Sequence, residues 1–148
     1  MVTNFTLVTD VQATLRRDFP LNDKTLANPN GTNPLIDGEF VNINTSYKLI
    51  RGVDGSLGFA VFAERGRFDV QALGKTTVLF ANTYEADTRV FTSAGLTHLG
   101  RLQVSASVTV DGKTKSGLAV YASGEVIGYV TKLPSSNGNK LRFIQTLV

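Results

Sequence analysis

Residues 101–110 of this chain read RLQVSASVTV, and Asp111-Gly112 follow directly. Leucine, valine or alanine stands at every second position of this stretch, and polar residues stand between them. Because successive side chains of an extended strand point to opposite faces, the alternation predicts one buried and one solvated face. An Asp-Gly pair favours a two-residue hairpin turn, since both positions tolerate a positive φ. The stretch therefore predicts a half-buried β-strand that enters a hairpin.

The same pattern of short strands and glycine turns continues on both sides of this hairpin. The further predicted strands lie at residues 40–43, 47–50, 57–63, 70–73, 76–80, 88–91, 118–121, 125–131 and 141–147. The run 57–63 is almost wholly apolar, which predicts a central strand covered on both faces. Only residues 10–17 carry a helical signal, with Asp10 as the N-cap. Many short strands with glycine turns predict an all-β protein that forms a single antiparallel β-barrel or β-sandwich domain.

Residues 1–38 depart from this pattern, and we expect them to form an extended N-terminal arm on a β-domain of residues 39–148. Three of the four prolines lie within residues 18–38. Each proline restricts the residue before it to extended conformations. The apolar residues of this segment are sparse and irregularly spaced: Phe19, Leu21, Leu26, Leu35 and Ile36. Such a segment either lies on a partner or folds back on its own domain, and both alternatives stay open.

Composition narrows the class of protein. The chain has 148 residues, of which 42% are hydrophobic, so we expect one domain with a core of its own. It has no cysteine, which excludes disulfides, thiolate metal sites and a cysteine nucleophile. Neither a signal-peptide pattern nor a stretch of transmembrane length occurs, so we expect a soluble protein made in the cytoplasm. The net charge of +3 is mild and its basic residues are scattered, so we expect no specific nucleic acid and no membrane as partners.

Catalytic signatures are sparse. The single histidine, His98, lies between Gly95 and Gly100 and has no Gly-x-Ser-x-Gly motif to serve, so we expect a solvated turn residue. Glu85 and Asp87 would share a face of a strand, and Glu64 and Asp69 form a second pair of the kind that glycosidases use. All lie beside turns or basic residues, as solvated charges do. We expect no enzyme, no metal and no cofactor.

Several short segments occur in a familiar order. They are DGEFV at 37–41, GRFDVQ at 66–71, ADT at 86–88 with Phe91, Gly95-Leu96, IGYVTKLP at 127–134 and LRF at 141–143. Together they resemble head decoration (cement) proteins of tailed bacteriophages, over residues 36–148. The resemblance implies a β-domain on the outside of the capsid of a virion, assembled in the host cytoplasm. It also implies bridging of major capsid protein subunits, often by dimers or trimers of the decoration protein.

We expect the N-terminal segment to supply the capsid contacts. The candidate capsid-binding residues are Val2, Phe5, Leu7, Arg16, Arg17, Phe19 and Leu21. The first three alternate suitably for adding a strand to an exposed sheet edge. The two arginines could pair with carboxylates of the shell, and the last two residues could fill apolar pockets. Repetition over a capsid would make many weak contacts effective together.

Three alternatives remain. The first is another virion component, of the tail or fibre base. The second is a small barrel that binds single-stranded nucleic acid, with Tyr129 and Phe143 stacking beside Lys132, Lys140 and Arg142. In strands of period two, however, such aromatics more often fill the interior. The third, a carbohydrate-binding module, is weakened by the absence of tryptophan.

Overall fold

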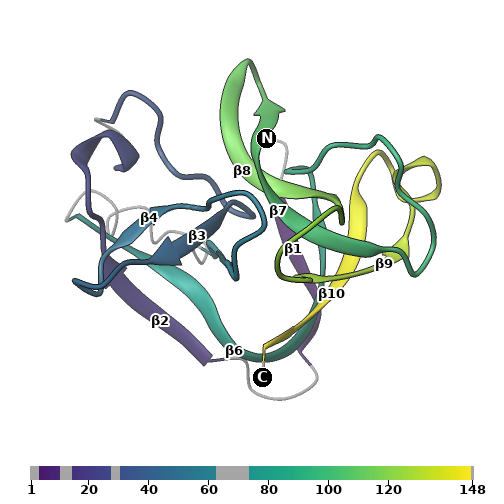
Figure 1. The fold of residues 1–148 in the computed structure, drawn as a ribbon, viewed down its shortest axis with the longest axis horizontal. Helices are drawn as coiled ribbons and strands as arrows, with labels where there is room; N and C mark the ends of the chain where they lie inside the picture. Colours follow the sequence, from purple (N-terminus) through teal and green to yellow (C-terminus); the bar gives the residue numbers. More distant parts are fainter. Residues whose placement is uncertain (1–3, 11–14, 28–30, 63–73, 148) are drawn as a thin grey trace.

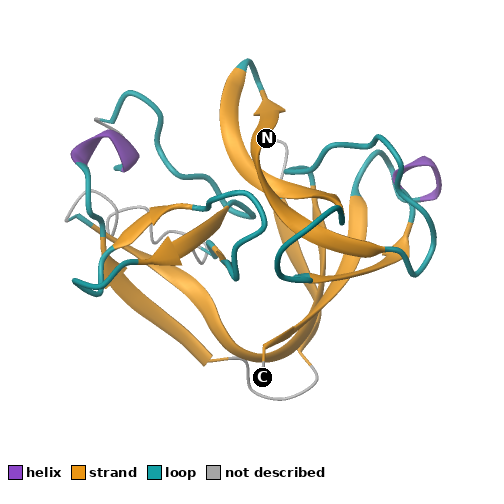
Figure 2. Cartoon of the chain, in the orientation of Figure 1, coloured by secondary structure: helices purple, strands orange, loops and turns teal. Residues whose placement is uncertain are grey.

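The computed structural model describes residues 4–10, 15–27, 31–62 and 74–147 of the chain. Within these residues nearly all regular structure is β, and the two helices are single 3-10 turns (Figure 2). The strands are β1 (Phe5–Asp10), β2 (Leu15–Pro20), β3 (Phe40–Ile43), β4 (Leu49–Arg51), β5 (Phe59–Ala60), β6 (Lys75–Thr88), β7 (Arg101–Val110), β8 (Lys113–Val120), β9 (Gly128–Lys132) and β10 (Leu141–Leu147). The 3-10 turns are η1 (Lys24–Leu26) and η2 (Pro134–Ser136). The predicted all-β class is confirmed.

The strands form two antiparallel sheets. The larger has the order β1-β6-β10-β9-β7-β8, with β2 also paired to β6, and the smaller has the order β4-β3-β5. The small sheet packs on the large one through Phe40, whose ring lies 6.2 Å from that of Phe143. Of the two predicted architectures, the described strands fit a sandwich, since they do not close into a single barrel.

The long strand β6 links two lobes of the molecule. Residues 75–81 of β6 pair with β2, whereas residues 82–88 pair with β1 and β10. Figure 1 shows β6 curving along the lower edge, from the part that holds β2, β3 and β4 to the part that holds β7, β9 and β10. We call β2 to β5 with residues 75–81 the small lobe. The large lobe is β1 with residues 82–88 and β7 to β10.

The hairpin predicted from residues 101–112 is confirmed. β7 pairs with β8 in antiparallel register, and Asp111 and Gly112 at its tip have φ values of 50° and 78°. Both residues adopt the left-handed backbone that a two-residue turn of this kind needs. Val104 and Val108 are buried, as the alternation predicts. The hairpin therefore supplies one wall of the large-lobe core.

Each lobe has its own apolar core, and the two cores share a wall. Neighbouring residues of one strand point to different cores because side chains alternate across a strand. Ala60 joins the large-lobe core and Val61 the small-lobe core, and Leu79 and Val78 divide in the same way. The predicted central strand at 57–63 is confirmed only around Ala60 and Val61. β5 is two residues long, and Leu57 is 52% exposed.

A buried ionic network joins the small sheet to β8. The Glu39 carboxylate is fully buried and accepts hydrogen bonds from Arg51 Nε at 2.8 Å and from the Ser116 backbone N–H at 3.2 Å. Lys115 Nζ lies 3.5 Å from Glu39 and donates to the carbonyl of Pro34 at 2.6 Å. Burial lowers the pKa of Lys115 despite the neighbouring carboxylate. The network holds the segment before β3 against the large sheet.

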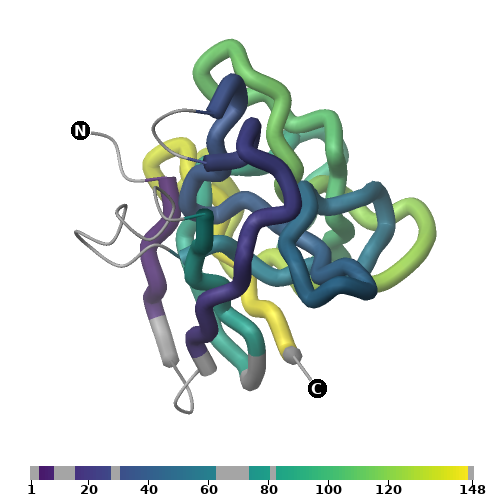
Figure 3. The backbone as a smooth tube through the Cα atoms, turned by 90° about the vertical axis from the view of Figure 1, so that its left-hand side faces the viewer, coloured from purple at the N-terminus to yellow at the C-terminus, as the bar shows by residue number. Residues whose placement is uncertain are grey.

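The described residues of the predicted arm (1–38) pair and pack with strands of the predicted β-domain (39–148). β1 and β2 both pair with β6, and Figure 3 shows this purple part of the chain lying along the body of the molecule. Leu26 and Leu35 are buried in the small-lobe core. Of the predicted helix at 10–17, Asp10 lies in β1 and residues 15–17 lie in β2, so the prediction is wrong there, and residues 11–14 lie outside the described residues. Apolar residues that are sparse along the sequence here reach a common core.

Candidate functional site

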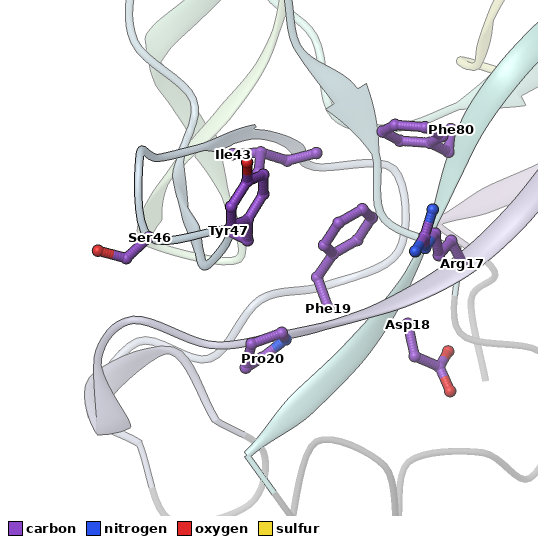
Figure 4. A pocket seen from close by; sticks show the side chains of 8 residues that line it. All are labelled: Arg17, Asp18, Phe19, Pro20, Ile43, Ser46, Tyr47 and Phe80. Carbon is purple, nitrogen blue, oxygen red and sulfur yellow. The ribbon is translucent and has the colours of Figure 1, made fainter.

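An open apolar cleft lies between β2 and the turn that joins β3 to β4. Its volume is about 500 Å³, within the range of pockets that take small ligands or single side chains. It is lined by Arg17, Asp18, Phe19, Pro20, Ile43, Ser46, Tyr47 and Phe80. Figure 4 shows the side chains of Phe19, Ile43, Tyr47 and Phe80 gathered around the cleft, whereas those of Ser46 and Asp18 point away. The cleft is thus a hydrophobic recess on the small lobe.

The floor of the cleft is a stack of phenylalanine rings. The ring centroids of Phe19 and Phe80 lie 5.4 Å apart, and those of Phe80 and Phe59 lie 5.3 Å apart. Alternation along β2 turns Phe19 toward the core and Asp18 to the other side, where it accepts a hydrogen bond from the Thr77 hydroxyl. Because these rings belong to the small-lobe core, the floor is held rigidly in place.

The rim of the cleft is formed by Tyr47, on a turn fixed by an asparagine. The Asn44 side-chain oxygen accepts hydrogen bonds from the backbone N–H groups of Ser46 and Lys48, each at 3.0 Å. Its amide nitrogen donates to Asn22 Oδ1 at 3.2 Å, which ties the turn to the segment after β2. Tyr47 has a φ of 59°, a left-handed conformation that costs a bulky residue about 1–3 kcal/mol. This strained backbone places the aromatic ring of Tyr47, which is 75% exposed, at the cleft.

Arg17 supplies the only cationic group among the residues that line this cleft. Its guanidinium carbon lies 5.7 Å from the centroid of the Phe19 ring, within the range of a cation–π contact. The side chain is exposed, so it can also pair with an incoming carboxylate. The cleft therefore offers an apolar surface with one positive charge at its edge. Such a site can bind an apolar group that carries a neighbouring anion.

Four of the predicted contact residues lie in or against the apolar cores of the chain itself. Phe5 is 3% exposed and Leu7 packs against the large-lobe core, because β1 already pairs with β6 of the same chain. Strand addition through the other edge of β1, which ends the strand order of the large sheet, stays a prediction. Phe19 is buried in the small-lobe core, and the partly buried Leu21 packs against that core. Val2 lies outside the described residues.

Both predicted arginines remain exposed, and one of them lies at the cleft. Arg16 places its guanidinium 5.2 Å from the Phe62 ring, on the other side of β2 from Arg17. Of the predicted residues, Arg17 and Phe19 therefore meet at this cleft. Tyr47 was missed because residues 47–50 were predicted as a strand, whereas β4 begins at Leu49.

The candidate catalytic residues do not assemble into a site. His98 is exposed in a turn, as predicted. Asp87 is held by Arg142 at 2.8 and 3.1 Å and by the Asn137 side chain at 2.8 Å. Partial burial raises the pKa of Asp87, but these hydrogen bonds outweigh it and hold that pKa below its ordinary value, so Asp87 is unsuited to donate a proton at neutral pH. Glu64 and Asp69 lie outside the described residues.

The described residues contain neither a cluster of metal ligands nor a membrane-spanning helix. No three of their His, Asp or Glu side chains gather as metal ligands would. Likewise, the described part of the chain holds no helix of the length and apolar character that crossing a bilayer requires. In comparisons with known proteins, no family model, curated protein or solved structure matches this chain.

Proposed function

We propose that this protein is a non-catalytic adhesion module that docks on a protein surface through the cleft between Arg17 and Tyr47. The observation that carries the proposal is the preformed rim: a strained, mostly exposed tyrosine held over an aromatic floor. Backbone strain of this kind persists where a residue is needed in one position. A rigid aromatic rim also loses little conformational entropy when a ligand binds.

The partner in this proposal is the major capsid protein on the outside of a tailed-phage head. The resemblance of residues 36–148 to head decoration proteins supports this choice, and so does the all-β fold. An apolar side chain of the capsid protein would enter the cleft, and a carboxylate beside it would pair with Arg17. Each such contact is modest, so stable attachment would come from a dimer or trimer that engages several capsid subunits at once.

Co-sedimentation with expanded capsids that lack this protein tests the proposal. We expect the wild-type chain to pellet at a fixed ratio to the major capsid subunit. Tyr47→Gly removes the ring and suits the left-handed backbone, so it should weaken binding at least about tenfold without unfolding the domain. Val53→Ala, at an exposed apolar residue outside the cleft, is the matched control and should bind normally.

The outcomes separate the two parts of the proposal. If wild type pellets and Tyr47→Gly pellets equally well, the cleft is not the docking site. If wild type fails to pellet with capsids, the capsid is not the partner. Binding to isolated tails in the same assay would instead support a tail or fibre-base component.

A further inference from the structure

A second surface, of different chemistry, lies on the outer face of the large lobe. Tyr129 of β9 is paired with Arg101 of β7, and the backbone N–H of Tyr121 donates to the carbonyl of Arg101 at 3.0 Å. Side chains of directly opposed residues point to the same face of a sheet. Their neighbours Val130 and Leu102 are buried, so Tyr129, Arg101 and Tyr121 form a row on the solvent side. We call these three residues the outer row.

The outer row presents a flat aromatic surface with a fixed cation. Tyr129 is 44% exposed, a large value for an aromatic residue on a paired strand. The guanidinium carbon of Arg101 lies 4.6 Å from the centroid of the Tyr121 ring, and the Tyr121 hydroxyl donates to the Gly124 carbonyl at 3.0 Å. This stacking holds the guanidinium beside Tyr129 instead of leaving it to move freely. The row is therefore preorganised.

Positive charge extends from the outer row along β9. Lys132 is exposed, and a register shift in the β9–β10 pairing places it opposite Arg142. Arg142 is neutralised by Asp87, at 2.8 Å. Within the described residues, by contrast, neither Arg101 nor Lys132 has a carboxylate at ion-pair distance. The surface beside Tyr129 thus carries two uncompensated cations.

We propose that the outer row binds single-stranded nucleic acid. A base would stack on the exposed face of Tyr129, while Arg101 and Lys132 would bind the flanking phosphates. Only an unpaired base can offer its face to a tyrosine lying on a sheet, which favours single strands over duplex. No hydrogen-bonding pattern in the row selects one base, so we expect little sequence preference. This activity is independent of docking through the cleft.

Charge decides between this ligand and a neutral glycan. Either ligand could stack on a tyrosine, but a neutral glycan would gain nothing from the two uncompensated cations. The structure also separates the two aromatics that the sequence suggested for stacking. Phe143 is fully buried in the large-lobe core, whereas Tyr129 is available at the surface. A single exposed tyrosine with two cations predicts weak, salt-dependent binding.

Fluorescence anisotropy with labelled oligo-dT tests this proposal on the full chain. We expect binding at about 50 mM salt that weakens about sevenfold by about 200 mM, as two phosphate contacts imply. Tyr129→Ala should weaken binding about tenfold, whereas Tyr129→Phe, which keeps the ring, should bind like wild type. Arg101→Gln should reduce the slope of log K against log salt by about 0.7, the value for one lost phosphate contact. Lys113→Gln, at the exposed tip of the β7–β8 hairpin, is the charge control and should change neither quantity.

Four results would overturn the proposal. They are no binding of oligo-dT at low salt, binding that Tyr129→Ala leaves unchanged, equal affinity for a duplex, and salt-independent binding of a neutral glycan in place of oligo-dT. Circular dichroism of each variant confirms that it is folded, so that a loss of binding reports on the surface. None of these results bears on capsid co-sedimentation.

Discussion

Long antiparallel ladders join the strands of the large lobe, whereas the small sheet β4-β3-β5 of the small lobe has only short ones. β7 and β8 form a hairpin with a long antiparallel ladder. In the small lobe, β4 has three residues and β5 has two. The small lobe also has the β2–β6 ladder and two isolated bridges, Leu21 with Leu49 and Val61 with Val78. This difference indicates that backbone ladders contribute more to the large lobe, while the small sheet depends more on side-chain packing and on the Glu39 network. We therefore expect the small lobe to open first.

The largest effect should come from truncating the large-lobe core. The Phe143 ring is fully buried and lies 5.9 Å from the Tyr84 ring and 6.4 Å from the Phe5 ring. Phe143→Ala should lower the free energy of unfolding by about 3–5 kcal/mol. Phe19→Ala, at the floor of an open cleft, should cost only about 2 kcal/mol because less packing is lost there. Urea unfolding measures both values, and equal losses would contradict the proposed difference between the lobes.

Breaking the buried ionic network should affect the small lobe almost as strongly. Glu39→Gln leaves Arg51 and Lys115 without their shared counter-charge, which should cost about 3 kcal/mol. Native-state hydrogen exchange should show faster opening of β3 and β4 than of β7. The exposed Glu125→Gln is the control and should lie within about 0.5 kcal/mol of wild type. Uniformly faster exchange in both lobes would show that they open as one unit.

Acid should weaken the large lobe through one ion pair. The pKa of Asp87 is lowered in the folded state, so its contribution is present above the ordinary aspartate value of about 3.9. That contribution is lost as the pH falls through the lowered pKa. Wild type should therefore lose about 1 kcal/mol or less relative to Asp87→Asn between about pH 6 and about pH 2. Thermal unfolding at the two pH values measures the difference, and parallel behaviour of both proteins would exclude a role for this pair.

The smallest effect should come from the strained turn. Tyr47→Gly relieves the left-handed conformation but adds freedom to the unfolded chain, so its stability should change by about 1 kcal/mol or less. Tyr47→Ala keeps the strain and should be less stable than Tyr47→Gly. Denaturant midpoints compare the two variants. Equal stability would mean that the backbone of residue 47 carries no strain.

Local patterns predicted the strands that alternate clearly and missed those that depend on a partner. Residues 101–110, with alternate valines, and residues 40–43 form strands at the predicted bounds. β6 was predicted only in part: the predicted strand at 76–80 lies within it, and the predicted strand at 88–91 shares only Thr88 with it. Glu85 and Asp87 alternate with the buried Tyr84 and Ala86, so the period of two continues between the two predicted strands. β8 was predicted only from residue 118, since its first half is polar and gains its place from the hairpin.

The cleft could not be predicted because its walls are far apart in the sequence. Phe19 and Phe80 come from β2 and β6, and Tyr47 from a turn between two other strands. The sequence marked Arg17 and Phe19 as candidates, but it assigned Phe19 to a projecting role. Sparse apolar residues have the same spacing whether they anchor an arm to a partner or reach the chain's own core. Only tertiary contacts separate these cases.

The position of β10 sets the order in which this protein can fold. β10 is the last strand along the chain, yet it lies between β6 and β9 in the large sheet. While the chain is being synthesised, β1 and β2 must wait for β6, and β6 must wait for β10 before both of its edges are paired. Contacts of such long sequence separation make folding slow. The large sheet therefore completes only after its last strand has left the ribosome, and until then the edges of β6 and β9 stay open to aggregation.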